Sequence, residues 1–110
     1  MNTRGRKAKG RQHIVEIKQR LHELYPEFTD EDIIIPATSA PGEDMLFSPE
    51  FRKIFPFSIE GKRTEGLAQD YKFMEQAASN AGPHTPIVIM RSNRKPALVM
   101  MYLTDWEKLL

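Results

Sequence analysis

The sequence predicts an α/β or α+β fold: a mixed sheet of about five strands flanked by helices, in the order α-β-β-β-α-β-β-α. Two stretches repeat apolar residues at steps of three and four, the period of an amphipathic helix. Short apolar runs bounded by Pro, Gly, Asn and Asp lie between and after these stretches, as is typical of strands joined by turns. The length of 110 residues suits one domain with one two-layer core, in which helices cover the sheet.

The first helix is expected over residues 11–25, where the apolar positions recur at helical spacing and Pro26 ends the pattern. Residues 33–35 form a short apolar run followed by Pro36, which predicts an edge strand. A turn is expected over residues 39–42, and a second strand over residues 44–47. Ser48 followed by Pro49 is typical of a helix start, so one or two helical turns should follow.

The remaining elements follow the same rules. Residues 56–63 predict a third strand, with Phe57 and Ile59 on the face opposite to Ser58, Glu60 and Lys62. A second helix should run from Leu67 to about Ala78, closed by Gly82. Residues 86–90 and 97–103 read as strands joined in a hairpin across residues 92–95, and Thr104 as the cap of a short terminal helix.

Charge is distributed unevenly along the chain, although the net charge is only +1. Five cations fall within residues 4–11, and they are Arg4, Arg6, Lys7, Lys9 and Arg11. A basic arm of this kind attracts polyanions, most often nucleic acid, and Gly5 and Gly10 predict that residues 1–10 are flexible. The alternative is an inert solubilising tail.

Composition excludes several classes of protein. With 40% hydrophobic and 28% charged residues the chain is typical of a globular protein. It has no cysteine, hence no disulfide and no thiol nucleophile, and no apolar run of the roughly 20 residues that cross a bilayer. These features favour a cytoplasmic protein without a membrane partner. The absence of a Gly-x-x-x-x-Gly-Lys loop argues against a nucleotide cofactor.

The residues that suggest chemistry are Asp44, at the start of one expected strand, and Glu60 and Lys62 on the next. Side chains alternate across a strand, so Glu60 and Lys62 should project from one face while Gly61 offers only its backbone. Two carboxylates and a lysine at one edge of a sheet can hold a divalent cation and a water beside a phosphodiester. This pattern indicates a metal-dependent nuclease. The alternative is a solvated strand face carrying a weak charge pair.

The order of these elements, with an acid at the second strand and Glu-x-Lys on the third, resembles the PD-(D/E)XK nuclease superfamily and its restriction-endonuclease-like core. The segment Lys9-Gly10-Arg11 before the first helix resembles the small Holliday junction resolvases and related phage endonucleases. The resemblance covers nearly the whole chain. It implies that Asp44, Glu60 and the Gly61 carbonyl bind Mg²⁺, which Mn²⁺ may replace, and that Lys62 positions the attacking water.

Three positions depart from the family pattern or stay open. Glu43 competes with Asp44, because Gly42-Glu43-Asp44 stands where the family has a plain Pro-Asp, with Pro41 close by. The resolvases often carry a glutamate in the first helix a few residues after Lys-Gly, whereas Glu16 comes a little late here, so whether Gln12 or Glu16 joins the metal ligands stays open. Gln76, on the second helix, either faces the site or lies on the helix surface.

The predicted function is therefore Mg²⁺-dependent hydrolysis of DNA phosphodiesters, with branched DNA as the expected substrate. Arg52 and Lys53 could touch a second DNA strand, and the alternative is that they lie in a surface turn with Phe51, Ile54 and Phe55 buried. A junction with two-fold symmetry is most simply cut by a homodimer, so a homodimer is expected. Two alternatives remain: a general nuclease for duplex or single-stranded DNA, and a non-catalytic nucleic-acid-binding module of the same fold.

Overall fold

The computed structural model describes residues 3–37 and 42–110, and the chain divides into two compact units, Met1–Arg63 and Thr64–Leu110. The sequence had suggested a single domain after residue 10, whereas the contacts separate at the junction between Arg63 and Thr64. Of the turn expected over residues 39–42, only Gly42 is among the described residues, and Pro41 lies outside them. Gly42 has a φ of 105°, in the left-handed region that favours glycine.

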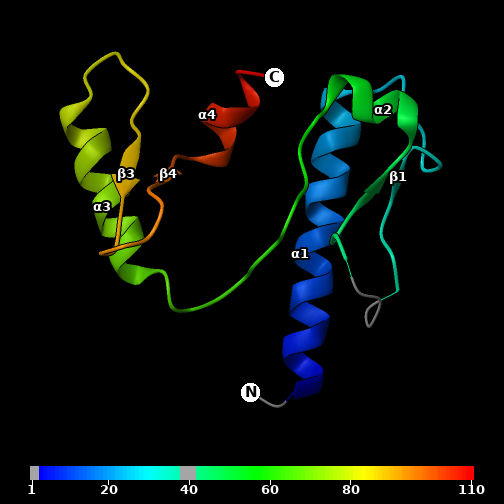
Figure 1. The fold of residues 1–110 in the computed structure, drawn as a ribbon, viewed down its shortest axis with the longest axis horizontal. Coiled ribbons are helices and arrows are strands. Elements are labelled where there is room, and N and C mark those ends of the chain that lie inside the picture. The colour runs from blue at the N-terminus through cyan, green and yellow to red at the C-terminus, as the bar shows by residue number, and fades with distance from the viewer. Residues whose placement is uncertain (1–2, 38–41) are drawn as a thin grey trace. The chain divides into compact units, whose positions relative to one another are not determined.

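The first unit contains α1 (Thr3–Leu24), β1 (Ile33–Ile34), β2 (Leu46–Phe47) and α2 (Pro49–Ile54) (Figure 1). β1 and β2 pair antiparallel, with Ile33 opposite Phe47. The predicted start of α2 is confirmed, because Ser48 is its N-cap and accepts a hydrogen bond from the Phe51 N–H at 3.1 Å. Local chemistry thus determines where this short helix begins.

Helix α1 begins at Thr3 and not at Arg11, so its backbone runs through the segment expected to be a flexible arm. Gly5 and Gly10 each disfavour a helix by about 1 kcal/mol relative to Ala. The residues between them are Arg, Lys and Ala, which are good helix formers. The backbone of residues 4–9 is therefore helical.

The core of the first unit joins α1, the β1–β2 ladder and α2. Ile33, Met45, Phe51 and Phe55 are completely buried, and Ile14 and Leu21 of α1 are 7% and 3% exposed. Phe51 and Phe55 stack at 5.3 Å between ring centroids, and edge-on rings surround them, namely Tyr25, Phe28, Phe47 and Phe57. Such aromatic contacts stabilise a core beyond the area they bury.

The expected third strand is wrong, since residues 56–63 run extended without strand pairing. Side chains form hydrogen bonds with two backbone groups of this segment that a neighbouring strand would otherwise have bound. The Arg52 guanidinium donates to the Phe57 carbonyl at 2.6 Å, and the Gly61 N–H donates to Asp44 Oδ2 at 2.8 Å. Pro56 has no N–H to offer. Two backbone groups of the segment therefore have side-chain partners where a sheet would have supplied a strand.

The second unit contains α3 (Ala68–Asn80), β3 (Val88–Met90), β4 (Leu98–Met100) and α4 (Leu103–Glu107) (Figure 1). β3 and β4 pair antiparallel with Ile89 opposite Val99, which confirms the hairpin. Arg94 in its turn has a φ of 64°. The expected cap of α4 is wrong, because the N-cap is Tyr102. Met74 of α3 is the buried apolar residue of this unit.

The prediction of a mixed helix-and-sheet class is confirmed, and the single sheet of about five strands is wrong. The described residues form four helices and two antiparallel two-stranded sheets. Strands of two or three residues offer few ladder positions, and hydrogen bonds from side chains replace the rest. Within the described part of the chain, no helix combines the length and apolar character that crossing a membrane requires.

Asp32 links the turn before β1 to the start of α2, which leads to a prediction about acid stability. Its carboxylate accepts hydrogen bonds from the Thr29 N–H at 2.9 Å and the Ser48 hydroxyl at 2.7 Å. These bonds, that from Thr29 most, hold the pKa of Asp32 below its ordinary value of 3.8. The folded state thus binds the proton less tightly than the unfolded chain does. The stabilisation is present above about pH 4 and is lost as the pH falls through the folded pKa.

Below about pH 4, we expect the free energy of unfolding of Asp32→Asn to fall less steeply with decreasing pH than that of the wild type. Ser48→Ala removes one of the two donors to Asp32, so it should reduce this pH dependence by less than Asp32→Asn does. Urea denaturation followed by circular dichroism at a series of pH values measures this slope. A wild-type slope in Asp32→Asn would contradict the prediction.

Candidate functional site

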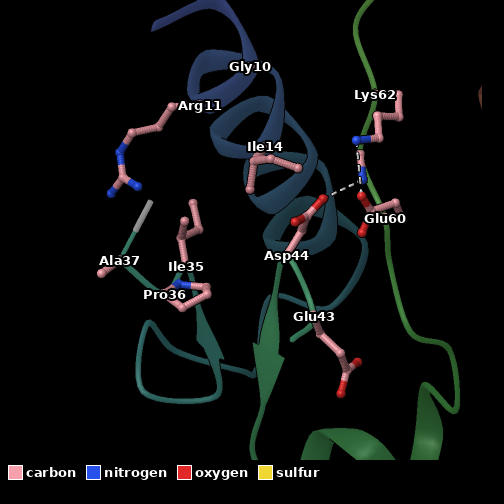
Figure 2. Close-up of a pocket in the computed structure, with 11 residues that line it drawn as sticks. Gly10, Arg11, Ile14, Ile35, Pro36, Ala37, Glu43, Asp44, Glu60 and Lys62 are labelled. Atoms are coloured by element: carbon pink, nitrogen blue, oxygen red, sulfur yellow. Dashed lines mark hydrogen bonds and ion pairs between the residues drawn. The ribbon is translucent and has the colours of Figure 1, made fainter. Parts of the chain in front are cut away.

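A pocket of about 250 Å³ lies in the first unit, between α1, the end of β1 and the extended segment at residues 60–62 (Figure 2). Gly10, Arg11 and Ile14 line it from α1, and residues 35–37 line it after β1. Besides Arg11, its polar lining residues are Glu43, Asp44, Glu60 and Lys62, with Gly61 between the last two. The structure therefore brings together the Asp44, Glu60, Gly61 and Lys62 that the sequence singled out from separate segments.

Asp44 and Gly61 are joined directly. The Gly61 N–H donates to Asp44 Oδ2 at 2.8 Å, and the Asp44 side chain is half-buried (Figure 2). A carboxylate that accepts from a backbone N–H is held in one orientation. This hydrogen bond uses Oδ2 of Asp44 and does not involve the other carboxylate oxygen, Oδ1.

Glu60 and Lys62 lie on the same side of the extended segment. Lys62 Nζ is 3.3 Å from Glu60 Oε1, with side chains 78% and 62% exposed respectively. The expected alternation therefore holds, even though residues 60–62 are not part of a ladder. An ion pair this exposed contributes at most about 1 kcal/mol to stability, so either partner is available for other ligands.

Gly61 lies tightly against helix α1. A Cβ built on Gly61 would overlap the Ile14 δ-methyl group, and it would lie 3.5 Å from His13 Cδ2. Ile14 is 7% exposed and lines the pocket, so its δ-methyl group would have to turn toward that space to make room. The glycine therefore allows the segment carrying Glu60 and Lys62 to approach the helix. Sequence reasoning assigned Gly61 a backbone role and missed this steric one.

Glu43 does not compete with Asp44 for the same space. Figure 2 shows its side chain directed away from the Asp44 carboxylate. It pairs with Arg52 at 3.2 Å, and the hydrogen bond from Ser58, followed by Arg52, holds the pKa of Glu43 below its ordinary value of 4.5. Asp44 is therefore the carboxylate that meets Gly61.

The other predicted residues lie elsewhere or at the rim. Arg11 lines the pocket, on the other side of Ile14 from Lys62 (Figure 2). Gln12 donates to Glu16 Oε1 at 3.3 Å on the exposed surface of α1, and neither residue lines the pocket. Gln76 belongs to α3 in the second unit. The side chains of Arg4, Arg6, Lys7 and Lys9 lie outside the described part of the structure.

The two basic residues of α2 differ from each other. Lys53 is exposed, as a nucleic-acid contact requires. Arg52 is held by the Phe57 carbonyl and by Glu43, and its guanidinium carbon lies 4.8 Å from the centre of the Phe47 ring. These contacts within the protein, rather than a free cation, are what the structure shows for Arg52.

The donors in the pocket are those that Mg²⁺ prefers. Asp44 and Glu60 supply carboxylate oxygens and Gly61 a backbone carbonyl, and Mg²⁺ commonly binds through one or two carboxylates while keeping several waters. Among the described residues, no three His, Cys, Asp or Glu side chains gather as a metal-binding group. Two carboxylates and one carbonyl would leave the remaining positions around such a cation to water and substrate phosphate.

The chain matches no protein-family model, no curated protein and no solved structure. Function is carried by sites rather than by folds. What this chain does is accordingly inferred from the residues of the pocket and from their mutual geometry.

Proposed function

We propose that the chain is a Mg²⁺-dependent endonuclease that hydrolyses phosphodiester bonds of DNA, with branched DNA as its preferred substrate. The observation that carries the proposal is the meeting of Asp44, Glu60, Gly61 and Lys62 in one pocket. Asp44 contacts Gly61, and Glu60 contacts Lys62, so the four form one continuous cluster. The order of these residue types resembles that of the PD-(D/E)XK nucleases, although Gly42-Glu43-Asp44 stands where that family has a plain Pro-Asp and Glu60 and Lys62 lie outside a strand.

In the proposed reaction a water oxygen attacks phosphorus, the bond to the leaving oxygen breaks, and that oxygen takes up a proton. Asp44, Glu60 and the Gly61 carbonyl would hold Mg²⁺, or Mn²⁺ in its place, which offsets charge on the phosphate and favours ionisation of water. The Lys62 ammonium orients the attacking water and stabilises the charge that develops on the phosphoryl oxygens. Arg11 at the pocket rim contacts a phosphate of the bound strand.

The test is a cleavage assay with Mg²⁺ that compares a four-way junction with its component duplexes. Cleavage of the junction in preference to the duplexes supports the proposal, and equal cleavage of both indicates a general nuclease. A two-fold junction is most simply cut by a homodimer, so light scattering with and without the junction belongs to the same experiment.

A non-catalytic nucleic-acid-binding module is the second candidate. It is favoured by the pairing of Lys62 with Glu60 and by the absence of a third acidic or histidine ligand among the described residues. Such a module would bind DNA without cutting it, whichever divalent cation is supplied.

The basic residues at the start of α1 should position DNA without taking part in the chemistry. We expect removal of residues 1–10 to weaken DNA binding while turnover at saturating DNA stays within about threefold, unless the loss of Gly10 next to Arg11 disturbs the pocket rim. If the segment makes about three phosphate contacts, the slope of log K against log salt becomes shallower by roughly 2–3.

Fluorescence anisotropy at several salt concentrations measures this slope. As a control, Arg4, Arg6, Lys7 and Lys9 are replaced together by Gln, which retains Gly10 and Arg11. An unchanged slope in both variants would identify the segment as an inert tail.

A further inference from the structure

Arg52, in the last turn of α2, contacts two separate segments of the chain at once. Its Nη1 donates to the Phe57 carbonyl at 2.6 Å, and its Nη2 donates to Glu43 Oε2 at 3.2 Å and to Oε1 at 3.4 Å. The planar guanidinium is suited to such divided contacts because its donors point in fixed directions.

These two segments are the ones that carry the carboxylates of the pocket. Glu43 precedes Asp44 directly, and Phe57 lies three residues before Glu60. The extended segment at residues 56–63 has no ladder to hold it, so its place depends on individual contacts. Arg52 supplies one near its start, the hydrogen bond from Ser58 to Glu43 supplies a second, and the Asp44–Gly61 hydrogen bond supplies one further along.

The backbone of α2 that carries Arg52 is held firmly in the core. Phe51 in α2 and Phe55 at its C-cap are completely buried, and Ser48 caps the start of the helix. The guanidinium also lies over the Phe47 ring of β2, at 4.8 Å from its centre. A side chain held at its base and along its length loses little further freedom when it makes its hydrogen bonds.

We propose that Arg52 is a positioning residue for the proposed nuclease site: by clamping Glu43 and the Phe57 carbonyl together, it holds the segments of Asp44 and Glu60 at their working separation. This inference deepens the proposed function and rests on it. It replaces the expectation that Arg52 touches DNA. A residue that acts through geometry affects turnover, because displacement of a catalytic group by about 1 Å costs on the order of 100-fold in rate.

The test compares Arg52→Gln and Arg52→Lys with Lys53→Gln, which removes the neighbouring exposed cation. A clamp predicts that Arg52→Gln lowers kcat by about 10–100-fold while the Kd for DNA and its salt slope stay as in the wild type. Arg52→Lys keeps the charge and one contact, so it should recover part of the loss. Lys53→Gln is the comparison for a DNA contact, with a weaker Kd and a shallower salt slope.

A second readout needs neither metal nor DNA. The Gly61 N–H that bonds to Asp44 should exchange with solvent about tenfold faster in Arg52→Gln than in the wild type, as measured by NMR. Should Arg52→Gln fail to fold, Glu43→Gln removes one anchor of the clamp and carries the same two measurements.

The outcomes separate the two proposals. Faster Gly61 exchange together with a lower kcat supports the clamp. A wild-type Gly61 exchange rate, or a weakened Kd and shallower salt slope at unchanged kcat, would overturn it. If the wild-type protein cuts no DNA, the nuclease proposal fails, and the exchange measurement alone then decides whether Arg52 orders the segment.

Discussion

Lys62→Ala, Asp44→Asn and Glu60→Gln should each reduce cleavage of junction DNA to near background while the protein stays folded. Loss of one group that stabilises developing charge costs about 10²–10³-fold in kcat, which is the expectation for Lys62→Ala. The two carboxylate changes should cost about 10³-fold or more, because the cation that they would hold in the proposed reaction would supply several kcal/mol of charge stabilisation.

The structure explains why the fold should survive. The Glu60–Lys62 pair is exposed and contributes at most about 1 kcal/mol. Asn at position 44 keeps an oxygen that can accept the Gly61 N–H, so Asp44→Asn removes charge with little change in shape. The loss should therefore lie in kcat, with most of the DNA affinity retained.

Glu27→Gln is the matched control, because Glu27 is an exposed carboxylate of the same unit that does not line the pocket. Single-turnover cleavage and anisotropy binding, measured on the same preparations, separate chemistry from affinity. Wild-type cleavage by Lys62→Ala would show that the assignment of this pocket is wrong.

The second large effect concerns Gly61 and needs no assumption about function. Gly61→Ala should lower the free energy of unfolding by about 1–3 kcal/mol, because the new Cβ would overlap the Ile14 δ-methyl group in a buried position. Backbone strain is not the cause, since Gly42 and Gly82 are the described glycines with positive φ. The expected loss is purely steric.

Ile14→Val removes the atom that the new Cβ would meet. Alone it should cost about 0.5–1.5 kcal/mol, as is usual for loss of one buried methyl group. In the double variant with Gly61→Ala, the loss of unfolding free energy should be smaller than the sum of the two single losses. Urea denaturation of the wild type, the two single variants and the double variant completes this double-mutant cycle. Strict additivity would mean that Gly61 does not lie against Ile14.

Gly10→Ala provides the control for changing a glycine. A Cβ at Gly10 meets nothing within 4 Å, and the residue lies in the interior of α1. Alanine there should stabilise the protein by about 0.5–1 kcal/mol through helix propensity. Opposite signs at Gly10 and Gly61 would show that the environment, rather than the residue type, decides the result.

Features determined by neighbouring residues were predicted well. The spacing of Ile14 and Leu21 predicted an amphipathic helix, and both side chains are buried in α1. Ser48 and Pro49 predicted the start of α2, and the cap hydrogen bond is present. The hairpin of β3 and β4 was also predicted, and the two strands pair antiparallel. In each case the deciding interaction spans only a few residues, so the local sequence contains it.

The candidate site was predictable in part. Asp44, Glu60 and Lys62 were chosen for their residue types and spacing, and they line one pocket. The roles of Ile14 and Arg52 were not visible, because each acts on a residue that is adjacent only in the folded chain. A glycine between Glu60 and Lys62 was the available signal, and it does not reveal which side chain it makes room for.

By itself, the sequence determined the start of α2, the β3–β4 hairpin, the mixed helix-and-sheet class and four residues of the pocket, Asp44, Glu60, Gly61 and Lys62. Tertiary structure alone decided that residues 56–63 pair with side chains instead of strands, and that the contacts separate after Arg63. The physical reason is that a strand depends on its partners. An apolar alternating run becomes part of a sheet only when another backbone reaches it, and here Arg52 and Asp44 take the Phe57 carbonyl and the Gly61 N–H.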